Sequence, residues 1–170
     1  MLILYFCDLK RYILKVTLLW IGKSVGKHVV YGVEEYAKRI GRYHSFQIIE
    51  IPHLKNVDKI DVAMVKRKEG ELILSKFSSD DYVILLDENG KVFDSVQFSQ
   101  YMQKLMLQSV KNVIFVIGGA YGFDKAVYDR ANAKLALSAM TFSHQLIRVV
   151  FLEQLYRANT IIKNEPYHNI

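Results

Sequence analysis

The chain has little cysteine and little proline: its 170 residues include one cysteine, Cys7, and two prolines. A single cysteine excludes an intramolecular disulfide framework and any zinc site built from several cysteines. With so few prolines and no stretch rich in serine and glycine, the sequence offers no candidate linker. We therefore expect one domain.

Long apolar runs are absent as well. The most apolar stretch near the start, residues 2–7, is followed by Asp8, Lys10 and Arg11, and it falls far short of the ~18 residues that cross a membrane. The same stretch lacks the basic start and the small-residue cleavage site of a secretory signal. We expect a cytoplasmic protein with no membrane partner.

The residues that are present are typical of a globular domain: 51% are hydrophobic, 12% aromatic and 24% charged. The chain has 23 Lys and Arg against 17 Asp and Glu, which gives a formal net charge of +6. Such an excess suits a polyanionic partner such as RNA, although many ordinary domains are equally basic.

Apolar runs alternate with segments of helical periodicity along the chain. The expected strands are 15–21, 46–51, 82–86 and 113–117, and the expected helices are 25–43, 58–77, 95–109 and 143–159. Strands that are apolar throughout and alternate with helices are typical of a parallel sheet covered on both faces, which is an α/β fold. In such folds ligands bind at the carboxyl ends of the strands.

Three breaks follow expected strands, at Leu86, at Gly118 and at residues 137–142. Glycines at 118, 119 and 122 would let the backbone approach a ligand, but they would equally suit a tight turn from strand to helix. The spacing is neither the G-x-G-x-x-G of dinucleotide-binding folds nor a phosphate loop. A Rossmann oxidoreductase is therefore disfavoured, and the pattern alone leaves the ligand open.

Motifs for hydrolysis are missing, since the sequence has no H-E-x-x-H, no G-x-S-x-G and no histidines at metal-ligand spacing. We expect no metal. His144 and Arg148 are four residues apart on an expected helix, so they share a face, as do Glu153 and Arg157. Residues so placed are more often a solvated surface pair than a catalytic group.

Four ordered segments carry a resemblance to a known family. They are VIGGAYG at 116–122, LSAMTFSH at 137–144, RVVFLEQLYRA at 148–158 and NEPYH at 164–168, supported by EIP at 50–52 and KEGE at 68–71. Together they resemble the ribosomal RNA large-subunit methyltransferase H family of the SPOUT class. The resemblance runs from about residue 14 to the end of the chain.

The resemblance implies a S-adenosylmethionine-dependent enzyme that methylates ring nitrogen 3 of a pseudouridine in 23S large-subunit ribosomal RNA on the assembled ribosome. It further implies an α/β domain with a parallel sheet and a C-terminal trefoil knot, a homodimer, and no metal. Chain connectivity rules would not lead to a knot, because knots are rare exceptions to them.

Site residues follow from the same motifs. The methyl donor would contact Leu86, Gly118, Leu137, Ser138, Ala139, Met140, Thr141 and Phe142. Arg148, Arg157 and His168 would supply positive charge at the reaction, with His144 and Tyr167 shaping the site or handling a proton. The sequence departs from the family in two places: many members have Pro-Glu in place of Ala120-Tyr121, and Pro in place of Ser143, which could cap the last helix.

Two alternatives stay open at this point: a non-catalytic ribosome-binding or assembly factor of the same fold, and a methyltransferase of the same class that acts on transfer RNA or a small molecule. Residues 1–13 precede the family's pattern. They are either an artefact of the assigned start or an extension that packs on the domain, and we expect the domain, 14–170, to work without them.

Overall fold

The computed structural model describes residues 14–54, 61–108 and 110–168. The expectations for residues 1–13, for the first turn of the second helix and for Ser109 lie outside this part. None of the helices in the described ranges combines the length and the apolar character needed to cross a membrane.

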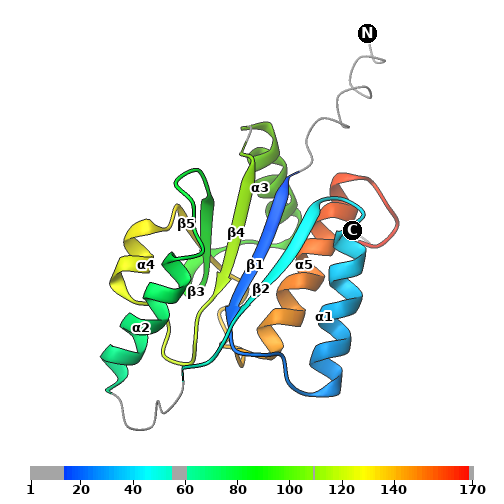
Figure 1. Cartoon of the computed structure of the whole chain (residues 1–170). Helices are drawn as coiled ribbons and strands as arrows, with labels where there is room; N and C mark the ends of the chain where they lie inside the picture. The colour runs from blue at the N-terminus through cyan, green and yellow to red at the C-terminus, as the bar shows by residue number, and fades with distance from the viewer. Residues whose placement is uncertain (1–13, 55–60, 109, 169–170) are drawn as a thin grey trace.

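Five parallel strands form one sheet (Figure 1). They are β1 (Lys15–Ile21), β2 (Ser45–Ile51), β3 (Tyr82–Val92), β4 (Asn112–Ile117) and β5 (Ala133–Ala136), in the spatial order β2-β1-β4-β3-β5. Every pairing is parallel, which confirms the predicted sheet type. The carboxyl ends of all five strands therefore share one edge of the sheet, where ligands bind in folds of this kind.

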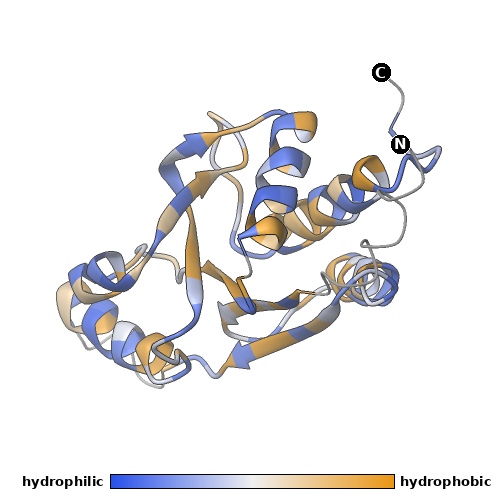
Figure 2. Cartoon of the chain, turned by 90° about the horizontal axis from the view of Figure 1, so that it is seen from above, coloured by the Kyte–Doolittle hydropathy of each residue, from blue (hydrophilic) through white to orange (hydrophobic). Residues whose placement is uncertain are grey.

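Helices cover both faces of the sheet (Figure 2). Helices α1 (Lys27–Ile40), α3 (Ser95–Leu107) and α5 (Leu146–Ile162) pack on one face, and α2 (Val62–Leu74) and α4 (Lys125–Arg130) on the other. β1 shows why both faces are apolar: Leu18 contributes to one core and Leu19 to the other, as successive strand residues point in opposite directions.

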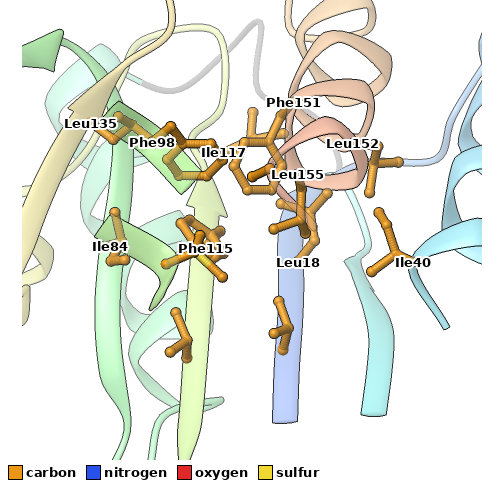
Figure 3. Packing of buried hydrophobic residues seen from close by; sticks show 14 of the residues in the cluster. Leu18, Ile40, Ile84, Phe98, Phe115, Ile117, Leu135, Phe151, Leu152 and Leu155 are labelled. Atoms are coloured by element: carbon orange, nitrogen blue, oxygen red, sulfur yellow. The ribbon is translucent and has the colours of Figure 1, made fainter. Parts of the chain in front are cut away.

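The larger core lies beneath α5, where Phe151, Leu152 and Leu155 are fully buried (Figure 3). Phe151 packs against Phe115 of β4, with ring centroids 4.7 Å apart. Burial of each such side chain contributes about 1.5–3 kcal/mol. The predicted amphipathic last helix is thus held by its apolar face, and this contact fixes where the segment before it, residues 137–145, must lie.

The structure corrects the predicted end of β3. We expected the strand to stop at Leu86, but it continues to Val92 after a register shift between Leu86 and Lys91. Gly90 has no side chain and lies so close to β5 that a Cβ there would be 2.5 Å from the Leu135 nitrogen. This close approach lets the polar stretch after Leu86 rejoin the sheet.

Helix starts also differ from the prediction. The cap of α3 is Asp94, not Ser95: its carboxylate accepts from the Gln97 N–H, and the Gln97 side chain accepts from the Asp94 N–H in return. Helix α5 begins at Leu146 rather than at 143, with Gln145 at the cap position. The Ser143 hydroxyl still accepts from the Leu146 N–H, so it caps the turn that leads into the helix.

Candidate active site

A cavity of about 590 Å³ opens at the carboxyl ends of β3, β4 and β5. Its volume lies within the ~300–1,000 Å³ range of small-molecule sites. Three chain segments form most of its wall: residues 86–89 of β3 at the register shift, residues 117–123 at the end of β4, and residues 135–144 at the end of β5. The three breaks noted in the sequence therefore converge on one cavity.

Seven of the eight residues predicted to contact a methyl donor line this cavity, namely Leu86, Gly118, Leu137, Ser138, Met140, Thr141 and Phe142. Ala139 does not line it.

Backbone atoms and apolar side chains shape the cavity wall. Gly119 and Gly122 close a tight turn, in which the Gly122 N–H donates to the Gly119 carbonyl at 3.1 Å and Gly122 adopts a φ of 77°. The Ser138 hydroxyl accepts from the Met140 N–H and fixes the turn after β5. Met140 is 77% exposed and Tyr121 is also exposed, so part of the lining presents apolar groups to solvent. Such surroundings suit a flat, partly apolar ligand.

His144 is the only predicted catalytic residue that lines the cavity within the described chain. Burial, the Arg148 guanidinium and His53 all lower the pKa of its imidazole. The ring is therefore neutral at pH 7 and can accept a hydrogen bond or a proton there.

Arg148 lies elsewhere, and the interpretation as a surface pair with His144 is wrong. The side chain is 0% exposed. Its guanidinium donates to the Ile21 carbonyl at 2.9 Å, to the Ser24 hydroxyl at 3.0 Å and to the His144 carbonyl at 3.0 Å, and it lies over the Trp20 ring. Burial lowers its pKa to about 10, so it stays charged. Arg148 thus ties the end of β1 to the start of α5, and it positions the cavity wall rather than facing the cavity.

Replacing Arg148 with alanine should lower the free energy of unfolding by about 3 kcal/mol or more, because a cavity forms and the buried Ile21 carbonyl loses its donor. Urea unfolding measures the change. Arg67→Ala is the control, since the Arg67–Glu71 pair on α2 is exposed and its loss should cost less than ~1 kcal/mol. Equal effects of the two variants would contradict the assigned role of Arg148.

The remaining predicted residues form a second group, the tail cluster, composed of Glu153, Arg157, Tyr167 and His168. Arg157 pairs with Glu153 at 2.5 Å and lies over the Tyr167 ring, 4.7 Å from its centroid. Its Nη1 lies 3.3 Å from His168 Nδ1, and the Tyr167 hydroxyl donates to Glu153 at 3.1 Å. The hydrogen bond to Glu153 raises the pKa of Arg157, and burial raises that of Tyr167.

The tail cluster does not line the cavity of its own chain. Ile147 at the start of α5 borders the cavity, and Arg157 is ten residues further, about 15 Å along the helix axis. Figure 1 shows the tail (red) at the end of the sheet where the strands begin. The structure therefore brings the predicted donor-binding residues and His144 together, but leaves Arg157, Tyr167 and His168 apart from them.

Beside the tail, His44 is 5% exposed and neither ring nitrogen has a hydrogen-bond partner among the described residues. Burial, with a smaller effect of Lys163, lowers its pKa from 6.5 to about 4. The unfolded chain therefore binds the proton first, so the folded state loses stability as the pH falls from about 6.5 towards 4.

His44→Gln should remove this loss. From the pKa shift of His44, the free energy of unfolding of the wild type should fall by about 2 kcal/mol more than that of the variant between pH 7 and pH 5. Urea unfolding of both proteins at the two pH values measures the difference. A variant with the same pH dependence as wild type would show that His44 is not buried in its neutral form.

Sequence reasoning missed the contribution of two helices. Lys66 of α2 and Tyr128 of α4 line the cavity, and Glu69 of α2 lies directly behind Gly119. Lys68 to Glu71 did carry part of the family resemblance, but no chemical motif marks these positions. In the described ranges no group of three or more His, Cys, Asp and Glu side chains is placed to hold a metal.

Comparison with known protein families places this parallel α/β domain in one of them. Residues 14–168 match the family model described as "Predicted SPOUT methyltransferase". The chain belongs to this family of SPOUT methyltransferases. The family resemblance noted in the sequence is thereby confirmed.

Curated relatives make the placement within the family more specific. The chain is 50% identical over 156 residues to the ribosomal RNA large subunit methyltransferase H of Flavobacterium johnsoniae, which covers 92% of this chain and 99% of that protein. The enzyme of the same name from Parabacteroides distasonis is 49% identical with the same coverage. That of Christiangramia forsetii is 51% identical over 154 residues, covering 91% and 98%.

Among solved structures, the SpoU methyltransferase AviRb from Streptomyces viridochromogenes, in complex with AdoMet, matches 88% of this chain and 62% of its own, with a TM-score of 0.44 and 11% identity. This likeness is too weak to support an inference about the chain.

Proposed function

We propose that this protein transfers a methyl group from S-adenosylmethionine to ring nitrogen 3 of a pseudouridine in 23S ribosomal RNA, on the assembled ribosome in the cytoplasm. Near 50% identity over almost the whole length of relatives named ribosomal RNA large subunit methyltransferase H supports the substrate class. The observation that carries the proposal is the convergence of Leu86, Gly118 and the segment after β5 on one cavity.

The cavity residues fit S-adenosylmethionine. Leu86, Ile117 and Leu137 provide apolar walls for an adenine ring, and the glycine turn at 118–122 presents backbone edges for polar groups. Asp87 and Glu88 at the rim offer carboxylates to a ribose or to a positive charge. When bound, the donor supplies a methyl group already activated by a sulfonium, which needs no metal and no covalent enzyme intermediate.

The protein's own contribution is alignment and charge. The cavity wall holds the donor in a fixed orientation, which removes much of the entropic barrier to an in-line displacement. Ring nitrogen 3 of the target attacks most readily once its proton has left, and nearby cations lower the pKa of that imide. The Arg157 guanidinium, with His168 3.3 Å from its Nη1, is suited to this role, and neutral His144 in the cavity can accept a hydrogen bond or the proton.

A homodimer would bring these parts together. Arg157 lies about 15 Å along α5 from the cavity of its own chain, so a second copy must supply the tail cluster if it acts at that cavity. Exposed apolar side chains near the cavity, Val25, Phe142 and Leu146, offer surface for such a contact. The proposed active site is therefore shared between two copies of the chain.

We also propose that the C-terminal part is threaded as a trefoil knot. After β5 at the edge of the sheet, residues 137–145 lead the chain to α5, which packs on the face opposite to α4. The chain thus passes from one face of the sheet to the other over a short connection, which is compatible with a threaded, knotted C-terminal part. Residues 14–168 account for the family match, and we propose that the domain functions without residues 1–13.

Calorimetric titration with S-adenosylmethionine separates an enzyme from a non-catalytic ribosome-binding factor of the same fold. We expect saturable binding with one site per chain in the micromolar range. A protein that binds ribosomes but not the donor would support the non-catalytic factor. Binding of the donor with methylation of transfer RNA instead of ribosomes would support the other methyltransferase.

A further inference from the structure

Glu69 is a buried glutamate with one unpaired carboxylate oxygen in the part of the chain that the structure describes. It lies on α2, is 7% exposed, and its Oε2 has no hydrogen-bond partner among the described residues. Glutamate is almost never buried in this way unless it is paired, because removing an ionised carboxylate from water is costly. Its burial also raises its pKa. Packing alone would be better served by an apolar residue of the same size.

The carboxylate is held directly behind the glycine turn of the cavity. A Cβ at Gly119 would lie 3.0 Å from Glu69 Cδ and Oε1, and closer still to Oε2, so a larger residue there would push the carboxylate out of this position. The next residue, Gly70, brings α2 against α4, because a Cβ there would lie 2.9 Å from the Asp124 Cβ. These two close approaches fix Glu69 against Gly119.

Gly119 lines the cavity, and it is the residue that stands between the carboxylate and the cavity at this point. A glycine offers no side chain to separate the charge from a ligand. A negative charge on a side chain that is only 7% exposed stabilises a positive charge across the wall more than a fully exposed carboxylate would. Lys66, one turn earlier on α2, lines the same cavity and carries the opposite charge.

We propose that Glu69 is a specificity residue of the donor pocket, whose buried negative charge favours the positively charged sulfonium donor over its neutral thioether product. This inference rests on the proposed function. It explains why an unpaired carboxylate is kept behind a glycine: the group stabilises the charged ligand that must enter and not the product that must leave.

Calorimetric titration of the intact protein with S-adenosylmethionine and, separately, with S-adenosylhomocysteine tests the inference. Glu69→Gln keeps the shape and removes the charge. It should weaken donor binding about tenfold and change product binding by less than about twofold. Glu71→Gln is the matched control, since Glu71 lies two residues further on the same helix in an exposed pair with Arg67. It should change neither affinity.

Thermal unfolding of the same proteins distinguishes a charge effect from a packing effect. Glu69→Gln should unfold at the same or a higher temperature than wild type, since it relieves a buried, unpaired charge. Glu69→Met is a second variant, for use if the buried amide of Glu69→Gln destabilises the protein. Methionine needs no hydrogen bond, and this variant should also lose the preference for S-adenosylmethionine over S-adenosylhomocysteine. Equal weakening of donor and product, or no change in either, would overturn the inference. A wild-type protein that binds no donor would instead refute the proposed function.

Discussion

Arg157→Ala is expected to lower methyl transfer to ribosomes by about 100-fold or more while S-adenosylmethionine affinity changes by less than about twofold. Arg157 lies outside the proposed donor cavity, and its guanidinium pairs with Glu153 and stacks on Tyr167. A cation that acts on the developing negative charge of the RNA base contributes to the transition state and not to donor binding. Single-turnover methylation with tritiated donor, together with calorimetry, measures both quantities.

Deletion of residues 167–170 should likewise lower methyl transfer strongly and leave donor affinity nearly unchanged, because it removes the aromatic and imidazole partners of Arg157. Arg67→Ala is the matched control, since Arg67 makes an ion pair with the same i,i+4 spacing on α2. It should methylate at the wild-type rate. Wild-type turnover in Arg157→Ala or in the deletion would remove the tail cluster from the proposed active site.

Gly118→Val is expected to weaken S-adenosylmethionine binding by about 100-fold or more. A Cβ at Gly118 would already lie 3.2 Å from the Phe123 ring, so the two methyl groups of valine must displace that ring or enter the cavity. Either result removes space that the donor requires. Calorimetry measures the affinity, and circular dichroism checks that the sheet and helices are kept.

Gly41→Val is the control for the glycine substitution itself. Gly41 follows α1 with helical backbone angles, and a Cβ there would make ordinary contacts at 3.5 Å. It should bind the donor as wild type does. Unchanged donor affinity in Gly118→Val would contradict the assignment of the cavity as the donor site.

The two defective variants together test the shared active site. Neither Gly118→Val nor Arg157→Ala should methylate alone. If the tail cluster acts at the cavity of the second copy, a mixed dimer contains one intact cavity facing one intact tail, and mixing the variants should restore up to about a quarter of the activity by random pairing. Absence of any recovery, with exchange of subunits demonstrated, would place both parts of the site in one chain.

Much of the fold could be predicted because it depends on local patterns. The run from Val113 to Ile117 is apolar throughout and is buried throughout, so it predicted a central parallel strand correctly. The bounds of the short elements α4 and β5 were not predicted, because six and four residues are too few to show a period. The predicted end of β3 was wrong, because residues 87–90 have the composition of a turn. Only pairing with β5 makes this stretch part of the sheet.

The site was predicted in part, and the reason lies in long-range contacts. Leu86, Gly118 and Leu137 follow strands, and the topology of a parallel sheet brings such positions to one edge. The burial of Arg148 could not be read from the sequence, because its acceptor, the Ile21 carbonyl, is 127 residues away. Glu69 was missed for the same reason: its neighbour Gly119 belongs to a different part of the chain.

The central claim is that this chain methylates a pseudouridine of large-subunit ribosomal RNA. The most direct measurement incubates the purified protein and tritiated S-adenosylmethionine with assembled ribosomes that lack the modification, and then locates the label by nuclease digestion and mass spectrometry. We expect about one methyl group per ribosome, in 23S RNA, on nitrogen 3 of a pseudouridine, with no label when Gly118→Val is used. No incorporation by a wild-type protein that binds the donor, or a label at any other base, would contradict the claim.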